Sequence, residues 1–275
     1  MNGHLPRPYR IGAGARSDDT VTFRQLAEMH RESILDCVQI LIVPEGRALY
    51  EEHLETIRSE EVPAIIHAPH HGLGINPCAP AAFETRTTAE MEDLIEEAMG
   101  MTYEAADILG APYIVLHAGR YEPGGREAAA REFKSFLDTH HDPRLILENL
   151  PSVFAGQELL GNTAEELLAL ADSRIGGFCL DFAHLYCTAN YRGKDYPDLL
   201  GAFETLPVRL FHLSNDRSGS IRDEHLPLDH PEGGIPMDII MDYYKGHLGI
   251  PLIIELKDRD AALYREQLTV FKRLF

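Results

Sequence analysis

The sequence predicts an α/β fold, a single (β/α)8 TIM barrel, and three observations support this prediction. The chain has 275 residues, close to the roughly 250 of a typical barrel, so we expect one domain spanning residues 1–275. Short apolar stretches alternate with helical patterns along the chain, as in repeated βα units. Six of these stretches end on a histidine or an acidic residue, and in this fold the active site lies at the carboxyl ends of the strands.

Eight apolar stretches are predicted to form the barrel strands. They are Arg10–Gly14, Cys37–Val43, Pro63–His67, Tyr113–His117, Leu145–Glu148, Gly177–Asp181, Val208–His212 and Pro251–Glu255. The four cysteines show no CxxC spacing, which argues against a thiolate metal site. Cys37 and Cys179 fall inside two of the strands, so we expect them to be core residues.

Capping signals and long polar segments lie between the predicted strands. Thr87 with Glu90 forms a capping box for a helix that reaches Leu109, and Thr163 with Glu166 begins the helix after the fifth strand in the same way. Two long loops, residues 67–80 and 214–235, follow the third and seventh strands and therefore belong on the active face. Loops of this length inside a compact domain are usually functional.

Composition limits the possible partners of the protein. The formal net charge of −19 excludes a binder that holds nucleic acid through a generally basic surface, so a polyanion requires a local positive patch or the substrate is small. No apolar run approaches the roughly 18 residues of a membrane helix, and the N-terminus lacks the apolar region of a signal peptide. We therefore expect no membrane partner and a cytoplasmic location.

Three strand-end carboxylates predict a metal site. Glu148, Asp181 and Glu255 would all point into one barrel mouth, and charged residues are rarely buried unless they are paired or bind metal. His212 supplies a nitrogen donor from a neighbouring strand. A divalent cation would remove the repulsion between the carboxylates.

The remaining candidate ligands raise the question of how many ions are bound. His184 lies about one helical turn after Asp181, and Asp223 and His225 are two residues apart, which in extended backbone points both side chains the same way. A single metal needs only the four residues of the preceding paragraph. The additional candidates His184, Asp223 and His225, together with His67 and His117, suit a site with three zinc ions. Manganese or iron also fits this donor set.

Seven motifs cover nearly the whole chain and resemble one known family. They are HAPHHGLGIN, VLHAG, LILENLP, CLDFAHLY, FHLSND, RDEHLPL and IIEL. This set is similar to that of the endonuclease IV (type 2 apurinic/apyrimidinic endonuclease) family within the xylose isomerase-like TIM barrels. The resemblance implies DNA repair by a trinuclear zinc cluster that cleaves a phosphodiester. It implies one zinc at His67, His117 and Glu148, a second at Glu148, Asp181, His212 and Glu255, and a third at His184, Asp223 and His225.

The chain departs from the family at positions that contact DNA. His70-His71 stands where the family has a tyrosine-leucine pair that wedges into the duplex, and Glu45-Gly46-Arg47 replaces an Asn-x-Arg segment. We expect Arg47 to retain a substrate contact. The predicted substrate-binding residues are Arg47, His70, His71, Arg217 and Arg222.

Two functions follow from these residues. The leading hypothesis is a zinc-dependent phosphodiesterase, with DNA or a small phosphodiester as substrate and Glu148 and Glu255 as catalytic residues. Under this hypothesis Glu255 either orients the nucleophile or serves only as a metal ligand. A local positive patch is a further possibility, formed by Arg192, Lys194 and the two arginines of the long loop, Arg217 and Arg222. Otherwise these residues are solvated loop charges.

The alternative is a sugar or sugar-phosphate isomerase or epimerase with one Mn2+ or Mg2+, in which the two glutamates transfer protons. A barrel without catalytic activity is a third, less favoured possibility. The number of bound ions distinguishes the first two hypotheses.

Overall fold

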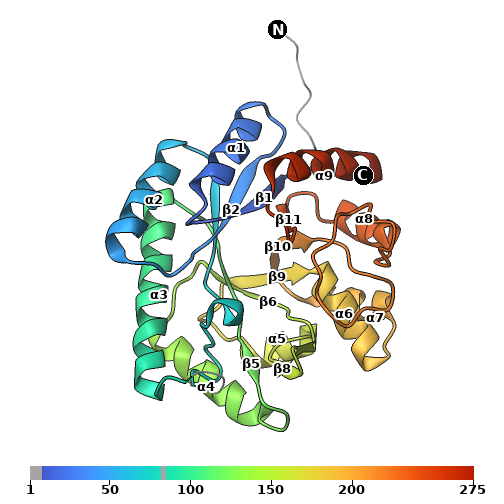
Figure 1. Cartoon of the computed structure of the whole chain (residues 1–275). Coiled ribbons are helices and arrows are strands. Elements are labelled where there is room, and N and C mark those ends of the chain that lie inside the picture. The colour runs from blue at the N-terminus through green and yellow to red at the C-terminus, as the bar shows by residue number, and fades with distance from the viewer. Residues whose placement is uncertain (1–7, 82–84) are drawn as a thin grey trace.

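The computed structural model describes residues 8–81 and 85–275 and contains a closed barrel of eight parallel strands surrounded by helices (Figure 1). This confirms the predicted fold class. The strands pair in the order β1, β2, β3, β4, β6, β9, β10 and β11, and β11 closes the ring by pairing with β1. Their bounds are β1 (Ile11–Arg16), β2 (Cys37–Leu41), β3 (Ala64–His67), β4 (Ile114–Leu116), β6 (Leu145–Glu148), β9 (Gly177–Asp181), β10 (Val208–Leu213) and β11 (Leu252–Ile254).

All eight strands lie where the sequence predicts them, and the differences are at their ends. β1 continues to Arg16 because Ala15 and Arg16 pair with the last residues of β2. β4 and β11 end one residue early, so His117 and Glu255 follow their strands directly.

The helices form the outer ring of the barrel. Within the described residues they are α1 (Thr20–Arg31), α2 (Arg47–Ser59), α3 (Thr88–Leu109), α4 (Arg126–Thr139), α5 (Ala164–Leu170), α6 (Phe182–Arg192), α7 (Tyr196–Ala202), α8 (Met237–Lys245) and α9 (Ala261–Leu274), with short 3-10 helices η1 (His71–Leu73) and η2 (Phe203–Thr205). None of the helices in this part of the chain is both long and apolar enough for a membrane span.

The two predicted helix starts are capped differently. Thr87 and Glu90 form the complete capping box at the start of α3. At α5 the Thr163 side chain accepts from the amide of Glu166, but the Glu166 carboxylate accepts from the amide of Asn162 at 2.9 Å, one residue before the cap.

Seven buried side chains, one from each of seven strands or the residues beside them, fill the barrel interior. They are Cys37, Ile65, Val115, Ile146, Cys179, Leu210 and Ile253. The eighth strand contributes Gly12 at this level, where a Cβ atom would lie 2.6 Å from both the Cys37 carbonyl oxygen and the Ile253 side chain. Only glycine fits at this position of β1, because the neighbouring strands leave no room for a side chain. The predicted core positions of Cys37 and Cys179 are confirmed.

A small antiparallel sheet, which the sequence did not predict, lies beside the barrel. Its strands are β5 (Arg120–Tyr121), β8 (Gln157–Leu159) and β7 (Val153–Phe154), in that order. Two-residue strands carry too little periodicity to be recognised in a sequence. This sheet holds the segment that follows β6.

Glu166 joins three outer segments, and its carboxylate is the basis of a stability prediction. It accepts from the amide of Asn162 and pairs with Arg126 of α4 at 2.8 Å and Arg192 of α6 at 2.9 Å. Burial would raise the pKa of Glu166, but the Asn162 amide and the two guanidinium groups outweigh it and lower that pKa. The folded pKa thus lies below the unfolded one, so the carboxylate contributes stability at neutral pH and loses it as pH falls through the folded value.

We predict that Glu166→Gln lowers the free energy of unfolding at pH 7 by about 1–3 kcal/mol. The difference from the wild type should shrink as pH falls below about 4, near the pKa of an unfolded glutamate. Urea denaturation at both pH values measures this, with the exposed neighbour Glu165→Gln as matched control. Equal losses in the two variants would contradict the prediction.

Candidate metal centre

The strand-end residues lie directly above the apolar interior of the barrel. Side chains two residues apart on a strand point to the same side. Each candidate follows an interior residue by two positions: Ile65 precedes His67, Val115 precedes His117, Ile146 precedes Glu148, Cys179 precedes Asp181, Leu210 precedes His212 and Ile253 precedes Glu255. The fold therefore directs all six side chains into the barrel mouth.

His67, His117 and Glu148 make up the first group. The Nε2 atoms of His67 and His117 lie 3.4 and 2.9 Å from Oε2 of Glu148. The three residues offer ligand atoms within 4.8 Å of one another, and all three are buried. This spacing fits ligands that converge on one ion.

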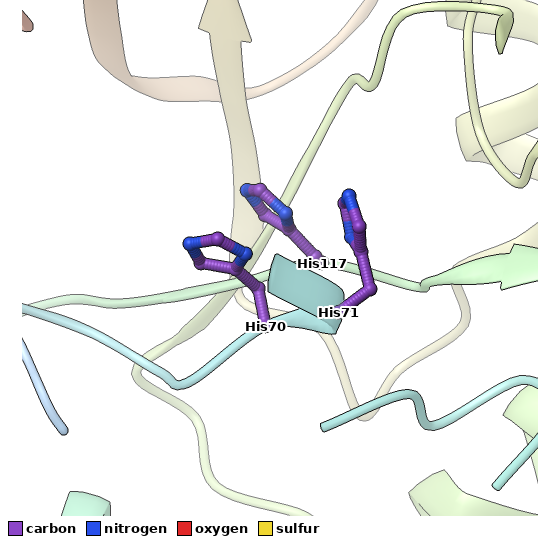
Figure 2. Close-up of side chains that lie close together, drawn as sticks. All are labelled: His70, His71 and His117. Atoms are coloured by element: carbon purple, nitrogen blue, oxygen red, sulfur yellow. The ribbon is translucent and has the colours of Figure 1, made fainter. Parts of the chain in front are cut away.

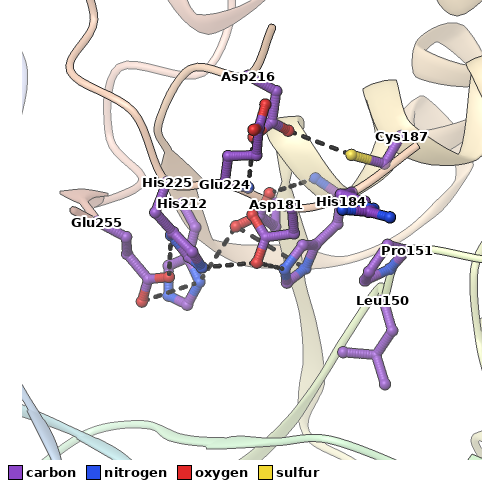
Figure 3. A network of polar contacts seen from close by, with 12 residues as sticks. Leu150, Pro151, Asp181, His184, Cys187, His212, Asp216, Glu224, His225 and Glu255 are labelled. Atoms are coloured by element: carbon purple, nitrogen blue, oxygen red, sulfur yellow. Dashed lines mark hydrogen bonds and ion pairs between the residues drawn. The ribbon is translucent and has the colours of Figure 1, made fainter. Parts of the chain in front are cut away.

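The second group surrounds Nδ1 of His212. This atom lies 3.1 Å from Oε1 of Glu148, 3.4 Å from Oε1 of Glu255 and 3.9 Å from Oδ2 of Asp181. Figure 3 shows Asp181, His212 and Glu255 turned toward one another. Because Glu148 turns one oxygen to the first group and the other to the second, it joins the two.

His184, Asp223 and His225 form the third group. Oδ2 of Asp223 lies 3.3 Å from Nε2 of His184 and 2.7 Å from Nε2 of His225. Asp181 caps α6 by accepting from the amide of His184 at 2.7 Å, which brings the second and third groups together. The backbone at His225 is left-handed, with φ of 49°, so the expected extended conformation is wrong there, although the two side chains still meet.

Hydrogen bonds to the far ring nitrogens orient three of the histidines. His67 bonds through Nδ1 to the carbonyl of Ala68 at 2.7 Å, and His184 through Nδ1 to the carbonyl of Asn149 at 2.8 Å. His212 bonds through Nε2 to Oε1 of Gln39 at 2.7 Å. In each case one ring nitrogen donates to a fixed oxygen acceptor and leaves the lone pair of the other for a ligand, as in metal-binding histidines.

The charges of the site balance only through protons or cations. Burial would raise the pKa of Glu148, but His212 and His117 hold it well below its usual range. Burial, together with the charge of Glu148, raises the pKa of Asp181 to about 6. Burial would lower the pKa of His212, but Glu255 and Glu148 raise it to about 9. Protons on histidines therefore offset the carboxylates when no ion is bound, and a cation would replace these protons.

The donor set fits divalent ions. Within the described part of the chain, Oδ2 of Asp181, Oδ1 of Asp223 and Nδ1 of His225 are buried without a hydrogen-bond partner. Buried polar atoms normally have partners, and an ion is one explanation when they do not. Imidazole and carboxylate donors together suit zinc, manganese or iron.

His70 and His71 lie beside the first group. With His117 they offer ring nitrogens within 4.8 Å of one another (Figure 2). Nδ1 of His70 accepts from the amide of Gly72, so the other ring nitrogen of His70 is a donor. The ring of His71 lies 5.3 Å from that of Phe154, and burial, with His117, lowers the pKa of His71 to about 3. Burial lowers the pKa of His70 as well, so both rings are neutral at pH 7.

A cavity of about 590 Å³ lies above the three groups. Of the predicted substrate-binding residues, His70, His71, Arg217 and Arg222 line this cavity. Arg217 is engaged by two carboxylates, those of Glu224 and Glu232.

The structure does not bring Arg47 to the cavity. Its guanidinium pairs with Glu51, one turn along α2, and with Glu104 of α3, both at 2.7 Å. Arg192 is likewise directed away, toward Ser152, Asn162 and Glu166. Groups on neighbouring segments hold both side chains, and the sequence gives no indication of these contacts.

Sequence reasoning missed two residues that support the site. Nε2 of Gln39 donates to Oε1 of Glu255 at 2.6 Å while Oε1 of Gln39 accepts from His212, so Gln39 orients both. Asp216 is buried, accepts from the amide of Glu224 at 2.7 Å and contacts the Cys187 thiol at 3.2 Å. It thereby anchors the loop between the third-group ligands Asp223 and His225. Gln39 follows the interior residue Cys37 by two positions, which is the signal that would have found it.

Lys257 and Arg259, also missed, follow β11 and line the same cavity. Their position beside the long loop depends on tertiary contacts, among them the bond from the Lys257 amide to the carbonyl of His225 at 3.1 Å.

Comparison with known proteins supports the resemblance seen in the motifs. The sequence profile of the xylose isomerase-like TIM barrel family matches residues 35–274. A protein named probable endonuclease 4 from Mesomycoplasma hyopneumoniae strain J is 27% identical over 199 residues, which cover 67% of this chain. The match spans 66% of that relative, just under two thirds of its length. The predicted resemblance to endonuclease IV is thus confirmed.

Solved structures share the fold. Endonuclease IV from Thermus thermophilus superposes with a TM-score of 0.67 at 22% identity, covering 96% of this chain and 98% of the other. A D-tagatose 3-epimerase-like protein superposes with a TM-score of 0.69 at 20% identity, covering 96% of each chain. At these identities the two structures establish the barrel and leave the reaction open.

We predict that Gln39→Met weakens divalent-metal binding about 10- to 100-fold, the usual effect of removing a group that orients metal ligands. Methionine keeps the length of the side chain but cannot accept from His212 or donate to Glu255. Competition with a chromophoric chelator measures the affinity. Gln25→Met, on the exposed face of α1, is the matched control, and unchanged affinity in Gln39→Met would contradict the positioning role.

Proposed function

The chain belongs to the xylose isomerase-like TIM barrel family, and from this premise we propose that it is a metal-dependent phosphodiesterase resembling endonuclease IV. The observation that carries the proposal is the third group, because His184, Asp223 and His225 converge beyond what a single metal site requires. We also propose that residues 1–275 act as one domain.

Each of the three groups would hold one zinc ion. His67, His117 and Glu148 would bind the first, Glu148, Asp181, His212 and Glu255 the second, and His184, Asp223 and His225 the third. When bound, such ions polarise phosphoryl oxygens and lower the pKa of water. The two oxygens of Glu148 face different groups, which suits a bridging ligand.

Glu255 has the position to orient the attacking water. Gln39 holds its Oε1 at 2.6 Å, which leaves Oε2 toward the cavity, 3.8 Å from Nδ1 of His225. Burial would raise the pKa of Glu255, but His212 and His225 lower it, so the group is a carboxylate that accepts a hydrogen bond at neutral pH. We assign Glu255 two roles: it orients the attacking water and accepts the proton of that water.

The cavity walls would bind the substrate. The ring nitrogen of His70 that faces away from Gly72 is a donor suited to a non-bridging phosphoryl oxygen. Leu150, Pro151 and Phe154 form an apolar rim that would exclude water from the reacting bond. DNA with an abasic site is the first substrate class to test, because the sequence relative is named an endonuclease, and small phosphodiesters are the second.

The isomerase alternative uses the second group alone. The D-tagatose 3-epimerase-like fold similarity makes it the competing hypothesis. It needs one Mn2+ or Mg2+ and gives the third group no role. Metal content therefore separates the two functions before any substrate is known.

We predict that the zinc-loaded protein hydrolyses phosphodiester bonds and that Glu148→Gln reduces hydrolysis to background, because this change disturbs the two groups that Glu148 joins. If duplex DNA is cleaved, the rate should fall steeply with salt as phosphate contacts are screened. Glu165→Gln, on the exposed face of α5, is the matched control. Conversion of a ketose with Mn2+, without turnover of any phosphodiester, would favour the isomerase.

A second prediction concerns the third group. His225→Ala should reduce the number of zinc ions per chain by one. It should lower hydrolysis by at least about 10- to 100-fold, because loss of a residue that only hydrogen-bonds to a metal ligand already has an effect of this size. Elemental analysis and anomalous scattering at the zinc edge count and locate the ions. His141→Ala, an exposed histidine that precedes β6 and so lies at the opposite end of that strand from Glu148, is the control. A fully loaded wild type with no ion at Asp223 would contradict the assignment.

A further inference from the structure

The cavity has two chemically different walls on opposite sides of the barrel. One wall follows β3 and β6 and carries His70, His71 and Phe154, with the ring of His71 against that of Phe154. The other follows β10 and β11, which are adjacent in the barrel, and carries Arg222, Lys257 and Arg259. We call this second set the cationic wall.

The cationic wall adjoins the third group. Arg222 directly precedes Asp223, and the amide of Lys257 donates to the carbonyl of His225 at 3.1 Å. Arg259 lines the same cavity as Gly14, near the end of β1. A ligand that reaches from the metal centre toward this side would therefore meet three cationic side chains.

These three side chains lack the carboxylate partners that other arginines of the chain have. Arg47 pairs with Glu104, Arg58 with Glu55, and Arg174 with Asp172. In residues 8–81 and 85–275, no carboxylate lies within 4.0 Å of the charged atoms of the cationic wall. The chain has 44 acidic and 25 basic residues, yet within the described residues these three cations have no carboxylate partner and remain free to pair with an anionic ligand in the cavity.

We propose that the cationic wall is a phosphate subsite, so that the substrate is a phosphodiester with a further phosphate group on the third-group side of the scissile bond. This inference rests on the proposed function. Arginine and lysine are the usual protein partners of phosphate. The opposite wall offers flat and apolar surface to the rest of the substrate, and about 590 Å³ is within the range of small-molecule sites.

The test compares a dinucleotide that carries a 5′-phosphate with the same dinucleotide without it. The wild type should show a KM about 10- to 100-fold lower for the phosphorylated substrate, with similar kcat, because the further phosphate contributes binding through charged hydrogen bonds. In the double variant Lys257→Met and Arg259→Met the ratio of the two KM values should approach one. Lys272→Met, an exposed lysine at the end of α9, is the matched control and should keep the wild-type ratio.

A wild type without preference for the phosphorylated dinucleotide, or a double variant that keeps the preference, overturns the subsite. Hydrolysis of bis(4-nitrophenyl) phosphate by the wild type tests the proposed function separately, since that compound has no further phosphate. If it is not hydrolysed, calorimetry with the 5′-phosphorylated dinucleotide still tests the subsite, because weaker binding by the double variant supports it and equal binding refutes it.

A further measurement, with abasic duplex DNA as substrate, identifies the source of the phosphate. If a DNA backbone supplies it, the wild type cleaves abasic duplex and the double variant shows a shallower salt dependence, by about one to two phosphate contacts. If a small molecule supplies it, only the dinucleotide shows the effect. Both results support a phosphate subsite and differ in what occupies it.

Discussion

The repulsion between buried carboxylates is the constraint on which this structure depends. Glu148 and Asp181 are almost fully buried at the barrel mouth, and Glu255 is close to both through His212. Two like charges about 4 Å apart repel by about 4 kcal/mol even at an effective dielectric of about 20. Positive charge must therefore be concentrated there, and the surrounding histidines are oriented to accept it. Gln39 supports this arrangement without adding charge, because its amide hydrogen-bonds to both His212 and Glu255 and holds the two side chains in place.

The sequence predicts those parts of the site that are fixed by strand register. Apolar strands that end on Glu148 or His212 imply a site at the barrel mouth, and these side chains point inward because the residues two positions before them lie in the barrel interior. The same argument extends to Gln39, two positions after the interior residue Cys37, but Gln39 lies inside its strand and an amide is common on protein surfaces. The ring of ligands is therefore better recognised from the interior residue below each ligand than from the strand end alone.

Contacts between elements could not be predicted in this way. Arg47 has the position of a substrate contact in the sequence, yet Glu104 on the neighbouring helix holds it outside the cavity. Lys257 reaches the cavity because a backbone bond joins it to His225, 32 positions earlier in the chain. The left-handed backbone at His225 likewise follows from loop closure. Each case depends on which helices and loops become neighbours, and a strand pattern carries no information on that.

The long loop after β10 carries both metal-ligand candidates and a cation of the cavity wall. Asp216 anchors this loop through the amide of Glu224, while Asn215 pairs with Leu226 across it. The loop that carries two metal-ligand candidates and Arg222 is thus anchored at these two points. An acidic surface repels polyanions at a distance, whereas a cavity with cations on one wall attracts an anion that has already entered. Such an arrangement selects against ligands that need broad contact with the surface and favours those that place their charge inside the cavity.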